Sequence, residues 1–302
     1  MASGEGLPSK HNIMASTQIL QRRIKTAQNV SKTTRAMQMI AASKLKKAQD
    51  AALSSRPYVE KLSSVTRIIS PRVEPAFIPT YMKKTEKSGK TLMIVVAPDK
   101  GLCGGLITNL VKEVLKRDNK KDIYLTIGKK VEGTVVYVGR ELIASFPFGN
   151  TLPKFDIVYP IAKVIDEHFL GGKVDKVEIL STHFENVFTQ KPVLSQLLPI
   201  LPFEETESDV KVTKKLSDNV QLFEPDVETI LPDLLKRYME MIIYQEILES
   251  YLSEQSARML SMQNATNNAK DIIEDLKLEY NKSRQAKITS ELLDITSGMV
   301  NN

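Results

Sequence analysis

The sequence contains no tryptophan and only one cysteine, Cys103. One cysteine cannot form a disulfide within the chain, which excludes a disulfide-stapled secreted domain and favours a reducing compartment. Aromatic residues make up 6% of the chain, a composition that suits a helix-rich protein better than an aromatic-packed β-sandwich. No apolar run approaches the ~18–20 residues of a membrane-spanning helix, so we expect a soluble chain.

The first residues also lack the marks of a targeting peptide. They have no apolar stretch typical of a secretory signal and no arginine typical of a mitochondrial transit peptide. Met14-Ala15-Ser16 repeats the opening Met1-Ala2-Ser3 directly before the first helical pattern. We interpret residues 1–14 as a disordered leader.

Glycine and proline are both missing from Asp233 to Ser297. This stretch consists mostly of good helix formers, and at ~1.5 Å per residue it would form a helix of roughly 98 Å. Because such a helix is too long for a compact domain of this size, it must pair with another helix or pass through a larger assembly. We assign residues 220–302 to this C-terminal coiled-coil helix.

A second helical pattern covers residues 15–62, with Ser16-Thr17 as N-cap residues. Apolar and small residues recur in steps of three and four, which indicates a coiled-coil stripe. The stripe consists of Leu20, Ile24, Ala27, Ser31, Thr34, Met37, Ala41, Leu45, Ala48 and Ala52. The run is predicted to end near Pro57, which makes the C-terminal helix longer by roughly 25 residues.

The two ends of the chain carry opposite charge. Residues 1–62 contain eleven lysines and arginines against three acids, whereas residues 226–302 contain eight against thirteen. Opposite charge favours pairing of the two helices, most simply as an antiparallel coiled coil.

The residues between the helices have an α/β texture. A linker is predicted at 63–90 and an α/β domain at 91–219. Short apolar runs predict strands at residues 91–97, 123–127, 134–138, 174–181 and 193–201, the last at a sheet edge because of Pro199 and Pro202. Helical patterns at residues 106–115 and 161–170 lie between them. The predicted fold is therefore a Rossmann-like α/β domain inserted into an antiparallel coiled coil.

No motif predicts catalysis, a cofactor or a metal. Ser88-Gly-Lys-Thr91 ends like a phosphate-binding loop, but Lys84 stands where that motif needs glycine, and the strand follows instead of preceding. Residues 101–105 (GLCGG) lack the spacing of a dinucleotide-binding loop and are better explained as a tight turn. Cys103 has no base in a recognisable pattern, and the three histidines lack metal-ligand spacing.

Two other function classes remain open on the residues alone. One is a free-standing α/β enzyme with a coiled-coil appendage. The other is a basic nucleic-acid-binding coiled coil, which the lack of aromatics between Leu20 and Arg56 argues against. Packing in the core is the ordinary explanation for Met37, Met39 and Ile40.

Three segments resemble one known family. Residues 28–45 (QNVSKTTRAMQMIAASKL), 99–105 (DKGLCGG), and 254–269 together with 280–298 resemble the γ subunit of F-type ATP synthases, in the family's order. The match covers both helices and the start of the α/β domain. Met299 departs from the small residue usual in the family after Gly298.

The resemblance implies a non-catalytic rotor shaft that couples proton or sodium ion flow to ATP synthesis or hydrolysis. Its implied partners are the α and β subunits of the catalytic ring, the ε subunit and the membrane c-ring, with no nucleic acid and no nucleotide bound by the chain itself. Residues matching family contact positions are Met37, Arg258, Gln285, Thr289 and Glu291.

The basic residues of the N-terminal helix fit the same picture. Lys44 and its basic neighbours would guide acidic loops of the β subunit past the shaft. The expected location is the cytoplasmic side of a bacterial plasma membrane, with the matrix side of the mitochondrial inner membrane as the alternative.

A rotor subunit is expected to purify with its partners. The native protein should migrate with several larger nucleotide-binding subunits in a native gel. Migration of the chain alone would contradict the rotor hypothesis, and steeply salt-dependent binding to duplex DNA would support the nucleic-acid alternative.

Overall fold

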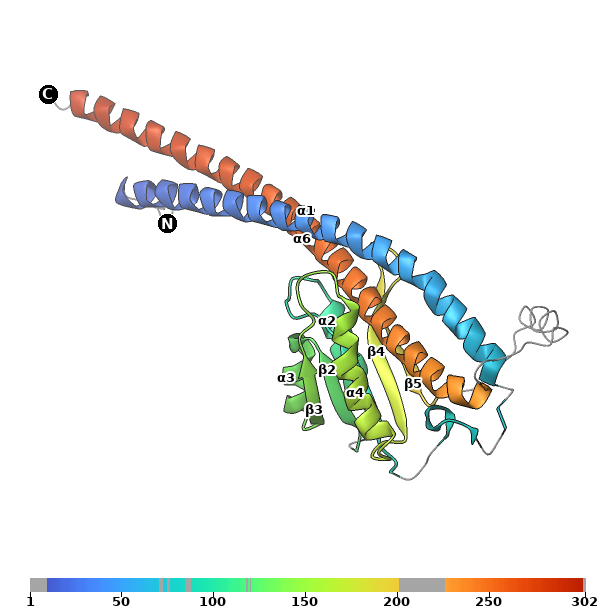
Figure 1. Ribbon diagram of the computed structural model, residues 1–302. Helices are drawn as coiled ribbons and strands as arrows, with labels where there is room; N and C mark the ends of the chain where they lie inside the picture. The colour runs from blue at the N-terminus through green and yellow to red at the C-terminus, as the bar shows by residue number, and fades with distance from the viewer. Residues whose placement is uncertain are drawn as a thin grey trace. The chain divides into compact units, whose positions relative to one another are not determined.

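The computed structural model describes residues 10–70, 73–74, 77–84, 88–117, 119, 121–200 and 226–300. The chain divides into two compact units. The α/β unit comprises Ala41–Arg258, and the helical unit comprises Met1–Ile40 with Met259–Asn302. The sheet lies in the α/β unit, and both long helices contribute to both units (Figure 1).

The two predicted long helices are confirmed. Helix α1 runs from Lys10 to Ile69 and helix α6 from Val227 to Val300. They contain 60 and 74 residues, so α6 is longer by 14 residues and not by the predicted 25. The predicted end near Pro57 and the predicted linker start at residue 63 are wrong.

Contacts just before the proline help to explain why α1 continues through Pro57. A proline inside a helix removes one backbone hydrogen bond and crowds the preceding turn. Just before it, Ser55 donates to Gln245 Oε1 at 2.6 Å, and Arg56 forms an ion pair with Glu249 at 3.0 Å. These bonds tie this turn of α1 to α6.

At the other end, α1 already includes residues 10–14 of the predicted leader, and residues 1–9 lie outside the described part. Residues 201–225 also lie outside it.

The α/β unit contains a five-stranded sheet of order β3-β2-β1-β4-β5. The strands are β1 (Thr91–Val96), β2 (Ile123–Ile127), β3 (Glu141–Phe146), β4 (Lys176–Phe184) and β5 (Gln190–Leu198). The first four are parallel and β5 is antiparallel to β4 at the sheet edge. The Rossmann-like prediction and the edge position of the last strand are therefore confirmed.

The predicted strand at residues 134–138 is wrong, because this segment belongs to helix α3 (Lys129–Tyr137). The β-branched run in this segment resembles a strand, yet Val131 and Val135, four residues apart, are both buried on one face of the helix. The strand follows instead as β3, which the sequence analysis did not predict. Gly128 makes the turn from β2 into α3, because a Cβ there would lie 1.8 Å from the carbonyl oxygen of Ala97.

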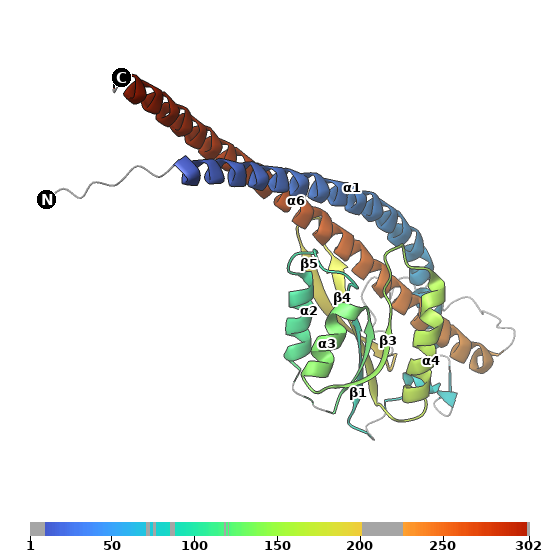
Figure 2. The ribbon, with the colours of Figure 1, turned by 90° about the vertical axis from the view of Figure 1, so that its left-hand side faces the viewer.

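Helices cover both faces of the sheet (Figure 2). Helix α2 (Leu106–Leu115) and α3 pack on the face that presents Met93 and Val95 of β1. Helix α4 (Val158–Phe169) packs on the opposite face with the first part of α6. Alternation along β1 produces this division, because successive side chains point to opposite faces.

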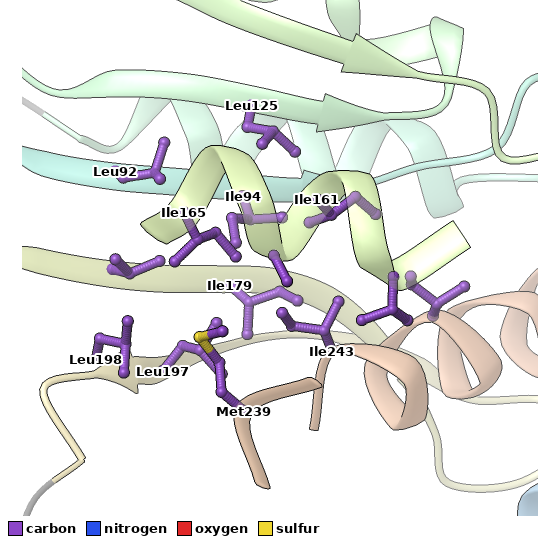
Figure 3. Packing of buried hydrophobic residues seen from close by; sticks show 14 of the residues in the cluster. Leu92, Ile94, Leu125, Ile161, Ile165, Ile179, Leu197, Leu198, Met239 and Ile243 are labelled. Carbon is purple, nitrogen blue, oxygen red and sulfur yellow. The ribbon is translucent and has the colours of Figure 1, made fainter. Parts of the chain in front are cut away.

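The first part of α6 belongs to the core of the α/β unit. Met239 and Ile243 are fully buried beside Ile179 of β4 and Ile161 of α4 (Figure 3). The buried α6 residues of this core are Leu231, Leu235, Met239, Ile243, Ile247, Tyr251 and Leu252. Six of them recur every four residues and Leu252 adjoins Tyr251, so they form one apolar stripe along the helix that faces the sheet.

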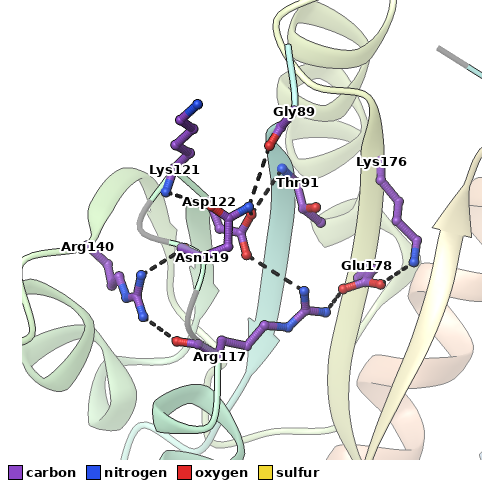
Figure 4. Close-up of polar contacts among 9 residues, drawn as sticks. All are labelled: Gly89, Thr91, Arg117, Asn119, Lys121, Asp122, Arg140, Lys176 and Glu178. Atoms are coloured by element: carbon purple, nitrogen blue, oxygen red, sulfur yellow. Dashed lines mark hydrogen bonds and ion pairs between the residues drawn. The ribbon is translucent and has the colours of Figure 1, made fainter. Parts of the chain in front are cut away.

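A polar network joins the amino ends of β1, β2 and β4 (Figure 4). The guanidinium of Arg117 forms ion pairs with Asp122, at 3.7 Å, and with Glu178. Lys176 pairs with Glu178 at 2.5 Å, and Asp122 accepts from the backbone of Thr91 at 3.2 Å. The buried carboxylates are thus paired, which removes most of the cost of burying them.

In the helical unit, α1 and α6 are antiparallel. The hydroxyls of Thr34 and Thr266 are 2.7 Å apart, and Gln21 donates to the hydroxyl of Tyr280 at 2.9 Å. Residue numbers fall along α1 as they rise along α6, which confirms the antiparallel prediction for these segments.

The seam of the helical unit does not include Met37. Leu20 is buried and Thr34 and Gln38 are half-buried, whereas the exposed fractions of Met37, Met39 and Ile40 are 37%, 66% and 56%. Core packing, the ordinary explanation for these three side chains, is therefore wrong within this chain. Gln38 takes the place predicted for Met37, because the alternating steps of four and three from Leu20 reach position 38 after Thr34.

Replacing Ile243 by alanine should destabilise the α/β unit, because it removes a fully buried side chain from the core. We expect a loss of about 2–5 kcal/mol in the free energy of unfolding, measured by denaturant titration. Ile288→Ala is the matched control, since Ile288 is 47% exposed on the same helix, and it should change stability by less than ~0.5 kcal/mol. Equal effects of the two substitutions would contradict the burial of α6 in the sheet.

Candidate functional site

Hydroxyl groups of α6 bond to the backbone of β4 where the sheet leaves it unpaired. The last register pair between β1 and β4 is Val95 with Leu180, and β4 continues to Phe184. Beyond that pair, Ser250 Oγ accepts from the amide of Thr182 at 3.1 Å, and Ser253 Oγ donates to its carbonyl at 2.9 Å. Two serines of α6 therefore satisfy polar groups that a neighbouring strand would otherwise pair.

A carboxylate one turn earlier adds a third polar contact between α6 and β4. Glu246 Oε2 accepts from Ser181 Oγ at 2.5 Å and contacts His183 Nε2 at 2.7 Å. Residues 246, 250 and 253 recur at helical spacing, so all three project from one face of α6. We call this face, with its partners on residues 181–183, the α6–β4 junction.

Arg258 bonds to the loop that follows β1, at the point where strand order reverses. In a doubly wound sheet, ligands bind outside the carboxyl ends of the strands at this switch point, which here lies between β1 and β4. Arg258 Nη2 donates to the carbonyls of Lys100 and Gly101 at 3.3 and 3.2 Å, and pairs with Glu254 at 2.6 Å. The chain's own side chains thus occupy the position used for ligands in related sheets.

Glu254 is the buried centre of this charge cluster. Its exposed fraction is 4%, and burial raises the pKa of its carboxyl while Arg258 lowers it. Asp99 and Lys44 also act on Glu254 electrostatically, and Lys44 Nζ donates to the carbonyl of Asn150 at 2.5 Å. Lys44 and Arg258, both predicted to contact partners, therefore lie close to one carboxylate in the α/β unit.

The turn that Arg258 holds is not a nucleophile loop. Cys103 is buried, and burial raises the pKa of its thiol, which disfavours the reactive thiolate. Leu102 has a φ of 66° and is 59% exposed, an uncommon backbone conformation for a leucine. The arginine bonds to Lys100 and Gly101 support the turn next to this strained residue.

The other predicted contact residues lie in the helical unit and are exposed there. Met37 forms an exposed apolar group with Met39 and Ile40 on α1. On α6, Gln285, Thr289 and Glu291 are all exposed.

Local contacts bring two of the predicted α6 residues together. The Thr289 hydroxyl donates to the backbone carbonyl of Gln285 at 3.0 Å, so these residues occupy one face on successive turns. Glu291 lies apart from them and pairs with Lys287 at 3.8 Å. Of the six predicted residues, Lys44 and Arg258 thus lie near the same carboxylate, that of Glu254, and Gln285 and Thr289 are bonded to each other.

The sequence analysis did not identify the α6–β4 junction. Ser253, Ser256 and Ala257, which follow one another closely on α6, are buried within the α/β unit. The signal available in the sequence was the recurrence of polar residues at 246, 250 and 253, in line with the apolar stripe that precedes them.

In the described part of the chain, no three His, Cys, Asp or Glu side chains lie together in a way that could hold a metal ion. No described helix combines the length and the hydropathy that a bilayer-spanning segment needs.

The sequence is similar to a family of known proteins. The family model for ATP synthase matches residues 16–300. The ATP synthase gamma chain of Dehalococcoides mccartyi (strain ATCC BAA-2266 / KCTC 15142 / 195) is 39% identical over 297 residues, covering 94% of this chain and 98% of the relative. The ATP synthase gamma chain of Polynucleobacter asymbioticus is 40% identical over 292 residues, covering 94% and 99%.

The fold is similar to solved structures as well. A chain from the Euglena gracilis mitochondrial ATP synthase (OSCP/F1/c-ring) has a TM-score of 0.66 at 18% identity, covering 95% of this chain and 94% of that one. A chain from the Tetrahymena thermophila mitochondrial ATP synthase central stalk and c-ring has a TM-score of 0.59 at 26% identity, covering 77% and 99%.

Replacing Ser253 by alanine tests the α6–β4 junction. The change would leave the buried carbonyl of Thr182 without its donor, and we expect a loss of about 1–3 kcal/mol in the free energy of unfolding. Ser54→Ala serves as a control, because the exposed Ser54 hydroxyl bonds only within its own helix. If the two variants unfold at the same denaturant concentration, the bond to β4 does not stabilise the fold.

Proposed function

Because the chain belongs to the ATP synthase γ chain family, we propose that it is the central rotor shaft of an F-type ATP synthase. Its partners in this role are the α and β subunits of the catalytic ring, the ε subunit and the membrane c-ring. Ion flow through the membrane sector turns the shaft, and the shaft changes the nucleotide affinity of each β subunit in turn. The same coupling runs in reverse when ATP is hydrolysed.

The observation that carries the proposal is the burial of α6 in the α/β unit. A shaft driven from its foot must not slip against the domain that receives the torque. Seven α6 residues lie in the sheet core, and three polar α6 side chains bond to β4 on the same helix face. The apolar stripe resists separation of helix and sheet, and the hydrogen bonds fix the register between them.

The exposed residues of the helical unit support contact with the ring. A rotating shaft changes the β subunits only if its contacts differ among their conformations. Met37, Gln285, Thr289 and Glu291 are exposed and are the contact positions that the family resemblance implies. We propose that they meet the β subunits.

Lys44 and Arg258 complete the proposed contact set. Both side chains are only partly exposed, because each is bonded to a backbone carbonyl of the α/β unit. For Arg258 we propose that it acts chiefly by holding the turn at Lys100 and Gly101 in position for a partner.

The chain itself is proposed to be non-catalytic. The contacts at the switch point support this part of the proposal, because Arg258 bonds there to Glu254 and to the loop after β1, where a doubly wound enzyme binds its ligand. Nucleotide binding then belongs to the ring subunits. The free-standing enzyme is the weaker alternative for the same reason.

Location and domain limits follow from the same proposal. We place the chain on the cytoplasmic side of a bacterial plasma membrane, held there by its partners, and the identity to bacterial gamma chains supports this choice over a mitochondrial matrix location. The functional domains are the N-terminal shaft helix from residue 15, the α/β domain within 91–219 and the C-terminal shaft helix within 220–302.

Removing the chain from Lys287 onward tests the proposal. This truncation deletes exposed residues at the end of α6 and leaves the buried α6 residues 231–252 in place. We expect ATP-driven ion pumping by the assembled complex to fall by more than about tenfold, a loss of ~1.4 kcal/mol or more in coupling free energy. The unfolding midpoint of the α/β unit should change little.

A matched control replaces Lys287 with alanine in the full-length chain, which breaks only the exposed pair with Glu291. Pumping should then stay near the wild-type rate. Loss of the α/β fold on truncation would show that the tail is core and not shaft. Unchanged pumping would contradict the coupling role of residues 287–302.

A further inference from the structure

His183 is a titratable side chain placed directly against the α6–β4 junction. It follows Thr182, whose backbone bonds to Ser250 and Ser253. Its Nε2 lies 2.7 Å from Glu246 Oε2, the same oxygen that accepts from Ser181 at 2.5 Å. The carboxylate side chain is 11% exposed, whereas the imidazole is 37% exposed and so can exchange protons with solvent.

We propose that His183 and Glu246 form a proton-dependent clamp, which tightens the bond between α6 and β4 when the imidazole is protonated. This inference goes beyond the proposed rotor function and does not depend on it. It concerns only the α/β unit, where all the participating side chains lie.

The charges around His183 support this assignment. Glu246 and Glu249 face it from α6, and both favour its protonated form. Glu249 is itself paired with Arg56 of α1 at 3.0 Å. On the sheet, Lys191 of β5 lies opposite His183 in register, but its ammonium pairs with Glu185 at 2.7 Å. Of these charged groups, the Glu246 carboxylate is therefore the one that is not paired with another charged residue and contacts His183 directly.

These surroundings set the direction of the pH dependence. The hydrogen bond that His183 donates to Glu246 raises the pKa of His183 above its ordinary value of 6.5, although burial acts in the opposite direction. A histidine whose pKa is raised by folding stabilises the fold fully below the pKa of the unfolded chain, near 6.5. That stabilisation is lost as the pH rises through the higher pKa of the folded state.

Loss of the proton weakens the hydrogen bond between His183 and Glu246 but does not remove it. A neutral imidazole can still donate one hydrogen bond from Nε2, whereas the imidazolium donates a stronger charge-assisted bond. Ser181 continues to donate to the carboxylate in either state. The clamp therefore varies in strength with pH while α6 remains seated on the sheet.

The test is hydrogen exchange of the Thr182 amide in the full-length chain within its complex. This amide is bonded to Ser250, between the two partners of Glu246, and it reports opening of the junction. Rates are corrected for the intrinsic pH dependence of exchange and compared between about pH 5.5 and 8.5. In the wild type we expect corrected exchange to accelerate roughly three- to tenfold as pH rises.

Three variants separate the clamp from ordinary packing. His183→Gln should abolish the pH-dependent change, and His183→Lys, which stays charged, should keep exchange slow throughout. Ser181→Ala should raise the exchange rate at every pH and retain the pH dependence, because it removes a bond without removing the titrating group.

Two results would overturn the proposal. One is an equal pH dependence in the wild type and His183→Gln, and the other is slower exchange at high pH than at low pH in the wild type. If His183→Gln does not assemble, Glu246→Gln decides the question. Loss of the pH dependence in that variant supports the clamp, and its retention contradicts the clamp.

Discussion

Burial of one stripe of α6 against the sheet is the interaction on which the rest of the structure depends. From Leu231 to Leu252 this helix supplies apolar side chains to the same core as β1, β4 and α4. Beyond the end of β1, the backbone of β4 has no neighbouring strand on that side, and apolar side chains cannot satisfy its hydrogen-bonding groups. Serine hydroxyls and a carboxylate take over there, on the same helix face.

The same helix meets different conditions in the helical unit. Its seam with α1 is narrow and partly polar, with paired threonine hydroxyls at 34 and 266. Large apolar side chains such as Met39, Leu278 and Ile295 are more than half exposed. These exposed apolar side chains are not buried by the chain itself, and surrounding subunits could bury them. The contrast between the two units explains how one helix can serve as core at one end and as contact surface at the other.

Much of this fold could be predicted from the sequence. The lack of glycine and proline from Asp233 to Ser297 indicated α6, and the continuous apolar run at 91–97 indicated β1. The end of α1 could not be predicted, because contacts at Ser55 and Arg56 with α6 override the local effect of Pro57. Likewise, Val135 and Val136 have strand propensity, but burial of Val131 and Val135 in one cluster against the sheet favours the helix.

The candidate site was less predictable than the fold. Resemblance indicated Arg258, but its bonds to the carbonyls of Lys100 and Gly101 depend on a loop more than 150 positions away in the chain. The α6–β4 junction depends on the unequal lengths of β1 and β4, which no local pattern encodes. Met37 was expected in the seam because it is apolar, whereas the steps of three and four place the polar Gln38 there.

Native-state hydrogen exchange across a denaturant series tests the central claim most directly. If α6 is part of the α/β fold, amides at its buried positions 235–252 should open with the same free energy and denaturant dependence as those of β1. The helix and the sheet would then be one cooperative unit. Exchange of these α6 amides through a separate opening of lower free energy, while β1 stays protected, would contradict the account.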